Sequence, residues 1–165
     1  MRFTALFLAV LLAPGLVVAQ EDIDESEVRE LLRTKMRTVQ HMALNPALIQ
    51  AVRQQNAEAL DMNNIKQRDG DWKATKALTP FKRSLQENHA GKMLKRYVNR
   101  NPSLNEAFLT DNKGANVAAF PATSDYWQGD EEKWTESFND GAGQLFLGPV
   151  ERDEKIGRAS CRERV

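Results

Sequence analysis

The chain has 165 residues, and its 23 lysine and arginine side chains balance 23 aspartate and glutamate side chains, so the formal net charge at neutral pH is zero. This balance gives no support to nucleic-acid binding, which needs a concentrated basic surface. The single cysteine, Cys161, excludes an internal disulfide framework. A chain of this length is expected to form one domain with its own core.

Residues 1–19 have the pattern of a secretory signal peptide. Arg2 precedes a largely apolar segment, Phe3–Ala13, and small residues lead up to Ala19. Pro14 interrupts the apolar run before it reaches the ~20 residues of a membrane span. We therefore predict cleavage after Ala19 and a secreted or periplasmic protein. A membrane-anchored protein that keeps this segment is the alternative.

Residues 155–165 resemble a sequencing adapter read in frame. They contain four basic residues, Glu163 and Cys161, and show no apolar periodicity. We interpret them as a non-native tail and leave them out of the expected fold, with a genuine basic tail as the alternative. Residues 20–154 alone carry 18 basic and 22 acidic side chains, a net charge of −4. That charge is ordinary for a soluble secreted domain.

The N-terminal half is expected to be helical. Apolar residues recur at three- and four-residue spacing from Val28 to Ala43, which predicts a long amphipathic helix. Asn45 is suited to cap a second helix that has Pro46 at its first position. The apolar stripe of these helices is suited to pack on the domain's own sheet.

The next segment, residues 62–70, is polar and predicts a turn-rich connection, with a break at Asp69 before Trp72. A third helix is predicted from Pro80 to Val98. The second half of this helix and the residues after it are basic, with Lys92, Lys95, Arg96 and Arg100. These cations suit the negative end of a helix, and an anion-binding patch is the alternative.

Strand patterns follow. Ala107–Thr110 and residues 115–120 flank an Asp-Asn-Lys-Gly sequence, which predicts a β-hairpin. Glu131–Phe138 has Trp134 and Phe138 on one face of a short helix, and Gln144–Val150 reads as another strand. Helices followed by strands around a short helix indicate an α+β fold with an antiparallel sheet.

Three segments of this region together resemble the Cache family of extracytoplasmic sensor domains. They are FLTDNKGANVA (Phe108–Ala118), TSDYWQGDEEKW (Thr123–Trp134) and GQLFLGPVERDE (Gly143–Glu154). The resemblance implies a PAS-like fold for residues 20–154, with a ligand pocket between the sheet and the loop and short helix that follow the hairpin. It also implies that the long N-terminal helices form the face of a homodimer, and packing of these helices on the domain's own sheet is the alternative. The resemblance further implies two closing strands beyond Glu154, which are missing here, so we expect a domain less stable than its complete parent.

The candidate ligand-binding residues lie in the second of these segments and in the hairpin turn. They are Asp125, Tyr126, Trp127 and Trp134, with Asp111 and Thr123 as second choices. Aromatic walls beside a carboxylate suit a ligand that carries an ammonium group. The alternative is that the two tryptophans belong to the core.

Motifs for catalysis or metal binding are scarce. His41 and His89 have no second ligand at metal-binding spacing, and no phosphate-binding loop or nucleophile elbow is present. We therefore expect no enzyme activity, cofactor or metal. The chain is interpreted as an exported sensor domain that binds a metabolite and signals through a partner such as a sensor kinase. The alternatives are the truncated sensor part of a transmembrane histidine kinase or chemoreceptor, and a non-catalytic secreted interaction protein.

Overall fold

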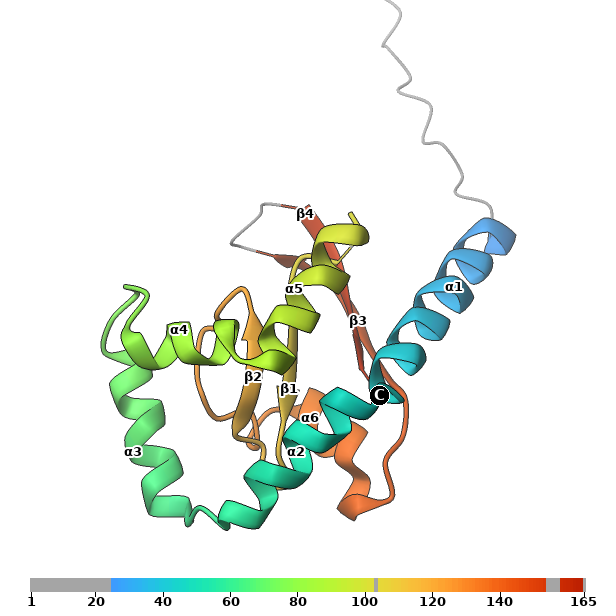
Figure 1. Ribbon diagram of the computed structural model, residues 1–165. Helices are drawn as coiled ribbons and strands as arrows, with labels where there is room; N and C mark the ends of the chain where they lie inside the picture. Colours follow the sequence, from blue (N-terminus) through green and yellow to red (C-terminus); the bar gives the residue numbers. More distant parts are fainter. Residues whose placement is uncertain (1–24, 103, 154–157, 165) are drawn as a thin grey trace, which may run out of the picture.

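The computed structural model describes residues 25–102, 104–153 and 158–164 (Figure 1). The predicted signal peptide lies outside these residues. The helices are α1 (Glu25–Ala43), α2 (Pro46–Glu58), α3 (Met62–Lys73), α4 (Pro80–Glu87), α5 (His89–Arg100) and α6 (Glu132–Phe138). The strands are β1 (Ala107–Thr110), β2 (Asn116–Phe120), β3 (Phe146–Asp153) and β4 (Arg158–Arg164). The predicted α+β class is confirmed. Within these ranges, no helix combines the length and the apolar character needed to cross a membrane.

The β1–β2 hairpin lies at the centre, and helices α2, α4 and α5 pack on it (Figure 1). Leu109 of β1 pairs with Ala118 of β2, and both contribute to a core cluster with Leu48 of α2 and Leu94 of α5. Ala118 and Ala119 are fully buried. Their small side chains let the helices approach the strand closely, so apolar area is buried between the helices and the strand.

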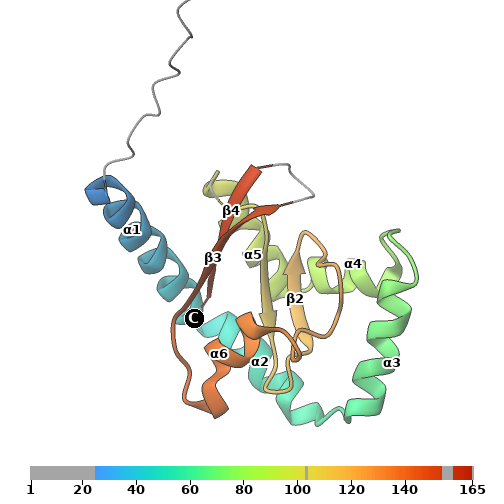
Figure 2. The ribbon, with the colours of Figure 1, turned by 180° about the vertical axis from the view of Figure 1, so that it is seen from behind.

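The described strands form two separate antiparallel pairs, β1–β2 and β3–β4. The short helix α6 contacts β3 and β4 (Figure 2). Its Lys133 lies over the ring of Phe108 in β1, 5.5 Å from the ring centroid, and so links α6 to the first hairpin. Since the pairs share no ladder among the described residues, the predicted PAS-like sheet and its missing closing strands stay predictions.

Several local predictions are confirmed. Asn45 caps α2, since its side-chain oxygen accepts a hydrogen bond from the Ala47 N–H at 3.0 Å, and Pro46 is the first helical residue. The hairpin turns at Gly114, whose φ of 81° favours glycine. Trp134 and Phe138 stack in α6 with their ring centroids 4.6 Å apart. The last predicted strand is present as β3.

The prediction of a turn-rich segment at residues 62–70 is wrong, because α3 runs through it. Asp61 caps the helix and accepts a hydrogen bond from the Asn64 N–H at 2.9 Å. Ile65, Asp69 and Trp72 are the buried residues of α3. Their spacing of four and three places them on one face, but the buried acid in the middle hid the apolar pattern.

The predicted helix from Pro80 to Val98 is two helices, α4 and α5, which break at Asn88. There the backbone is extended, with a ψ of 171°. The Asn88 side chain accepts a hydrogen bond from the Gly91 N–H at 2.7 Å and donates one to the Val117 carbonyl at 2.9 Å. The break therefore caps α5 and fixes it to β2.

Part of the segment that we left out of the expected fold is a strand. Residues 158–164 form β4, antiparallel to β3. Strand pairing uses backbone groups that every residue except proline offers, so the missing apolar periodicity did not exclude it. The proposed non-native origin of residues 155–165 is a separate question and stays a prediction.

Two helical glycines should respond oppositely to alanine. A Cβ atom on Gly91 would meet the Leu85 carbonyl oxygen and lie 2.6 Å from the Gln86 carbonyl oxygen, whereas one on Gly70 would meet nothing within 4 Å. We expect Gly91→Ala to lower the free energy of unfolding by about 1–3 kcal/mol. Gly70→Ala should raise it by about 0.4–1 kcal/mol. Urea unfolding of both variants beside the wild type measures this, and equal effects would contradict the packing described at the α4–α5 junction.

Candidate functional site

The loop after β2, residues 123–128, folds back along the hairpin. The Asn116 N–H donates to the Tyr126 carbonyl at 3.0 Å, and the Gln128 N–H donates to the Gly114 carbonyl at 2.8 Å. A bridge between Ala115 and Trp127 lies between these bonds. The loop is thus held along the start of β2 by these two hydrogen bonds and one isolated bridge.

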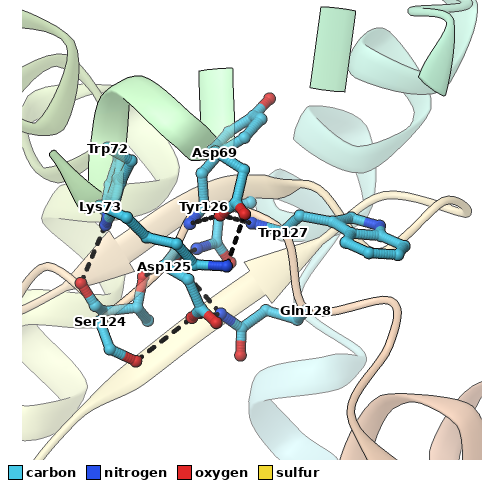
Figure 3. Close-up of polar contacts among 10 residues, drawn as sticks. Asp69, Trp72, Lys73, Ser124, Asp125, Tyr126, Trp127 and Gln128 are labelled. Atoms are coloured by element: carbon cyan, nitrogen blue, oxygen red, sulfur yellow. Dashed lines mark hydrogen bonds and ion pairs between the residues drawn. The ribbon is translucent and has the colours of Figure 1, made fainter. Parts of the chain in front are cut away.

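Asp69 of α3 fixes the loop from the other side (Figure 3). One carboxylate oxygen accepts hydrogen bonds from the Tyr126 N–H at 2.9 Å and the Trp127 N–H at 3.1 Å. The other pairs with the Lys73 ammonium at 2.6 Å. Asp69 is only 7% exposed, so these bonds are shielded from competing water. The hydrogen bond and charge of Asp69 raise the pKa of Lys73.

Tyr126, although predicted as a ligand contact, is a core residue that is 1% exposed. Its ring centroid lies 5.9 Å from that of Trp72 and 5.2 Å from that of Phe81. Burial raises the pKa of the Tyr126 phenol, and a hydrogen bond with Arg68 opposes that rise. This ring therefore holds the loop on the core.

Trp127 lies at the edge of the site and is half-buried. Its indole N–H donates to the Lys113 carbonyl in the hairpin turn at 2.7 Å. The Lys66 ammonium lies 5.7 Å from its ring centroid, so the ring already attracts a cation. Of the predicted aromatic residues in the loop, Trp127 is the one that remains accessible to a ligand.

Asp125 is half-buried and surrounded by polar side chains. Its carboxylate accepts hydrogen bonds from the Gln128 amide and from the Ser124 hydroxyl, the latter at 3.2 Å. Its backbone carbonyl accepts from the side-chain amides of Asn116 and Gln128, each at 3.2 Å. Two side-chain amides therefore converge on one residue.

The same two amides leave oxygen atoms without a partner. Asn116 Oδ1 and Gln128 Oε1 are buried and accept no hydrogen bond from the described residues. Asn116 is 0% exposed and Gln128 is 1% exposed. A buried acceptor that lacks a donor costs about 1–3 kcal/mol, and such atoms are rare in folded proteins. These oxygens are the chemical feature of the site that its internal contacts do not explain.

Asp111 and Thr123 are committed to internal bonds. Asp111 accepts hydrogen bonds from the Lys113 and Ala115 N–H groups, both at 2.9 Å, and from the Gln55 amide at 2.9 Å. The Thr123 hydroxyl accepts from Asn116 at 2.9 Å and donates to the Asp125 carbonyl at 2.6 Å. Both side chains hold the hairpin turn and the loop in place.

Five of the six predicted site residues therefore meet beside the start of β2, whereas Trp134 stacks on Phe138 in α6, which packs on β3 and β4. Sequence reasoning missed Asp69, Asn116 and Gln128. The helical spacing of Asp69 with Ile65 and Trp72 could have revealed the first. Within the described ranges, no three acidic, histidine or cysteine side chains gather in a way that could hold a metal ion.

Comparison with known proteins gives no family assignment. No protein-family model, curated protein or solved structure matches the chain.

Removal of the Asp69 carboxylate should loosen the loop. In Asp69→Ala, the N–H groups of Tyr126 and Trp127 lose their acceptor, at about 1–3 kcal/mol for each buried group. We expect a fall of about 2–4 kcal/mol in the free energy of unfolding. Asp69→Asn keeps an acceptor and should lose less. Lys73→Ala should change stability by less than about 1 kcal/mol, because that ammonium is half-exposed. Urea unfolding gives the order, and equal losses in the first two variants would contradict it.

The raised pKa of Tyr126 has a consequence at alkaline pH. The folded state holds the phenol proton more tightly than the unfolded state, so this stabilisation is complete below the usual tyrosine pKa of about 10 and is lost as the pH rises through the folded-state value. Absorbance at alkaline pH should show one phenol ionising above the usual range. That step should vanish in Tyr126→Phe and persist in Tyr97→Phe; its persistence in Tyr126→Phe would refute the assignment.

Proposed function

We propose that residues 20–154 form an exported small-molecule-sensing domain of the Cache type, with a PAS-like fold. Its ligand carries N–H donors and binds where the loop 123–128 meets β2, and its signal passes to a partner such as a sensor kinase. The resemblance of three segments to that family supports the class of protein. The local geometry of the loop supports the place of binding.

The pair of unsatisfied oxygens, Asn116 Oδ1 and Gln128 Oε1, carries the proposal. Both belong to amides that donate to the Asp125 carbonyl, so both lie near the same residue. Acceptors call for a ligand that donates. An amine or ammonium group supplies two or three N–H donors from one atom and satisfies such acceptors at hydrogen-bond distance.

Charge and aromatic character around the loop favour a cationic donor over a neutral one. The Asp125 carboxylate accepts a hydrogen bond from the Gln128 amide, and an ammonium group is attracted to it. The Trp127 ring already lies under the Lys66 ammonium at 5.7 Å. A ligand ammonium would occupy the same kind of environment, with a carboxylate on one side and an aromatic face on the other.

The contacts of the hairpin turn offer a route from the loop to the N-terminal helices. The Trp127 indole bonds to the turn at Lys113. The Lys113 ammonium donates to the Leu60 carbonyl after α2 at 2.6 Å, and the turn's Asp111 accepts from Gln55 of α2. A ligand that shifts Trp127 would therefore shift α2, which connects directly to α1. Such a shift is the proposed signal.

The test is calorimetric titration with a panel of aliphatic amines, diamines and amino acids, each paired with the analogue in which hydrogen replaces the amino group. We expect at least one amine to bind when its analogue does not. Gln128→Met removes one acceptor while keeping the length of the side chain, and should weaken binding at least about tenfold, as for a lost hydrogen bond to a charged group.

Gln54→Met is the matched control, because it makes the same substitution at an exposed glutamine of α2 outside the loop and should leave affinity unchanged. Two outcomes would defeat the proposal. One is equal binding by wild type and Gln128→Met. The other is that no amine binds while a crystal structure shows an internal water bonded to both amide oxygens.

A further inference from the structure

A cavity of about 370 Å³ lies between α1 and α5, and none of its lining residues belongs to the loop site. Its lining includes Thr38 and His41 from α1, and Met93, Arg96, Tyr97 and Arg100 from α5. We call it the α1–α5 groove. Small-molecule sites typically occupy about 300–1,000 Å³, so this groove is large enough for one small organic molecule.

The charged side chains in the groove lining are two arginines. Arg96 and Arg100 lie four residues apart, so they share one face of α5, and His41 faces the groove from α1. Like charges at this spacing repel each other. The lining contains no acidic side chain among the described residues, and neither arginine forms an ion pair within that part of the chain. An anion would remove the repulsion.

Compensation of the helix dipole explains the position of Arg100 but not that of Arg96. Arg100 is the last residue of α5, where a cation is favoured by the negative helix end. Arg96 lies outside the last turn, where that effect has faded. Its Nε–H donates to the Lys92 carbonyl at 3.4 Å, which leaves the terminal nitrogens of the guanidinium for a ligand.

The rest of the groove is apolar and held in place. Met93 and Tyr97 are half-buried and pack against the core cluster of Leu48 and Leu94. The Tyr97 hydroxyl accepts a hydrogen bond from Asn45 at 3.3 Å, and Asn101 donates to the Tyr97 carbonyl at 2.7 Å. The groove thus offers a fixed apolar wall beside guanidinium groups, which bind carboxylates and phosphates through paired hydrogen bonds.

From the apolar wall and the two arginines together, we infer that the α1–α5 groove is a second binding site, which takes an amphipathic organic anion: an apolar body that ends in a carboxylate or a phosphate. Its chemistry is opposite to that of the loop site, which needs a donor ligand. The inference does not depend on the proposed function, because the two sites share no residue.

Such an anion would also fasten α1 to the body of the protein. Among the described elements, α1 contacts α2 and β4, and Figures 1 and 2 show most of its length standing away from the other helices. A molecule held by Arg96 and Arg100 on one side and by His41 on the other would bridge α1 and α5. The groove then controls how firmly α1 is docked.

Octanoate is a suitable probe, tested by calorimetric titration and by amide chemical shifts of the full chain. Octanol, which lacks the charge, and acetate and inorganic phosphate, which lack the apolar body, are the comparison ligands; octyl phosphate tests whether a phosphate replaces the carboxylate. We expect octanoate to bind and to shift amides of Thr38, His41 and residues 93–101. Arg96→Gln should weaken its binding at least about tenfold, as expected for a charged hydrogen bond.

Lys92→Gln is the matched control, because it makes the same change of charge on the same helix outside the groove lining and should bind octanoate as the wild type does. Gln128→Met, which tests the loop site, should also bind octanoate normally. Octanoate should slow tryptic cleavage after Arg37 in the wild type but not in Arg96→Gln. Equal affinity of the wild type and Arg96→Gln, binding of octanol as tight as that of octanoate, or octanoate shifts confined to other residues would overturn the inference.

Discussion

The structure depends on one buried carboxylate. Asp69 accepts hydrogen bonds from the backbone N–H groups of two loop residues, which lie 57 and 58 residues further along the chain. These bonds set the direction of two neighbouring aromatic side chains, because consecutive residues of an extended segment point to opposite sides. Tyr126 therefore enters the core beside Trp72, and Trp127 is left at the edge, over the hairpin turn. Without Asp69, the loop would have two buried donors and no acceptor.

Asp111 has the same role in the hairpin turn, where its carboxylate accepts hydrogen bonds from two backbone N–H groups and from the side-chain amide of Gln55. Asp111 was a second-choice ligand residue from the sequence, and Asp69 was read only as part of a break before Trp72. In the structure, both use their oxygens to organise the backbone, which is the usual role of carboxylates in turns. The chemistry still open to a ligand comes instead from two neutral amides, Asn116 and Gln128, whose oxygens are buried without a donor.

The two proposed sites border different halves of the core. The loop site adjoins the cluster that contains Trp72 and Tyr126, and the α1–α5 groove adjoins the cluster that contains Leu94. The start of β2 and the residue before it connect them, since Ala115 belongs to one cluster and Ala118 to the other. Ligands of opposite chemistry, a cationic donor and an amphipathic anion, would thus act on the same strand. A change at the loop site would reach α1 through the hairpin and α2, whereas a ligand in the groove would contact α1 directly.

The sequence by itself determined the features that neighbouring residues create. The amphipathic α1, the Asn45 cap, the hairpin and the stack in α6 follow from short spacings and local hydrogen bonds, so they could be predicted. Only the tertiary structure decided that α3 is a helix, that Asn88 divides α4 from α5, and that Asp69 holds the loop. Each depends on a partner far along the chain: Asp69 gains its buried place from the loop, and Asn88 its second bond from β2. The aromatic and acidic residues of the loop could be identified from the sequence. Packing alone decided that Tyr126 lies in the core and that two buried amide oxygens lack a hydrogen-bond donor, because burial depends on contacts that no local pattern encodes.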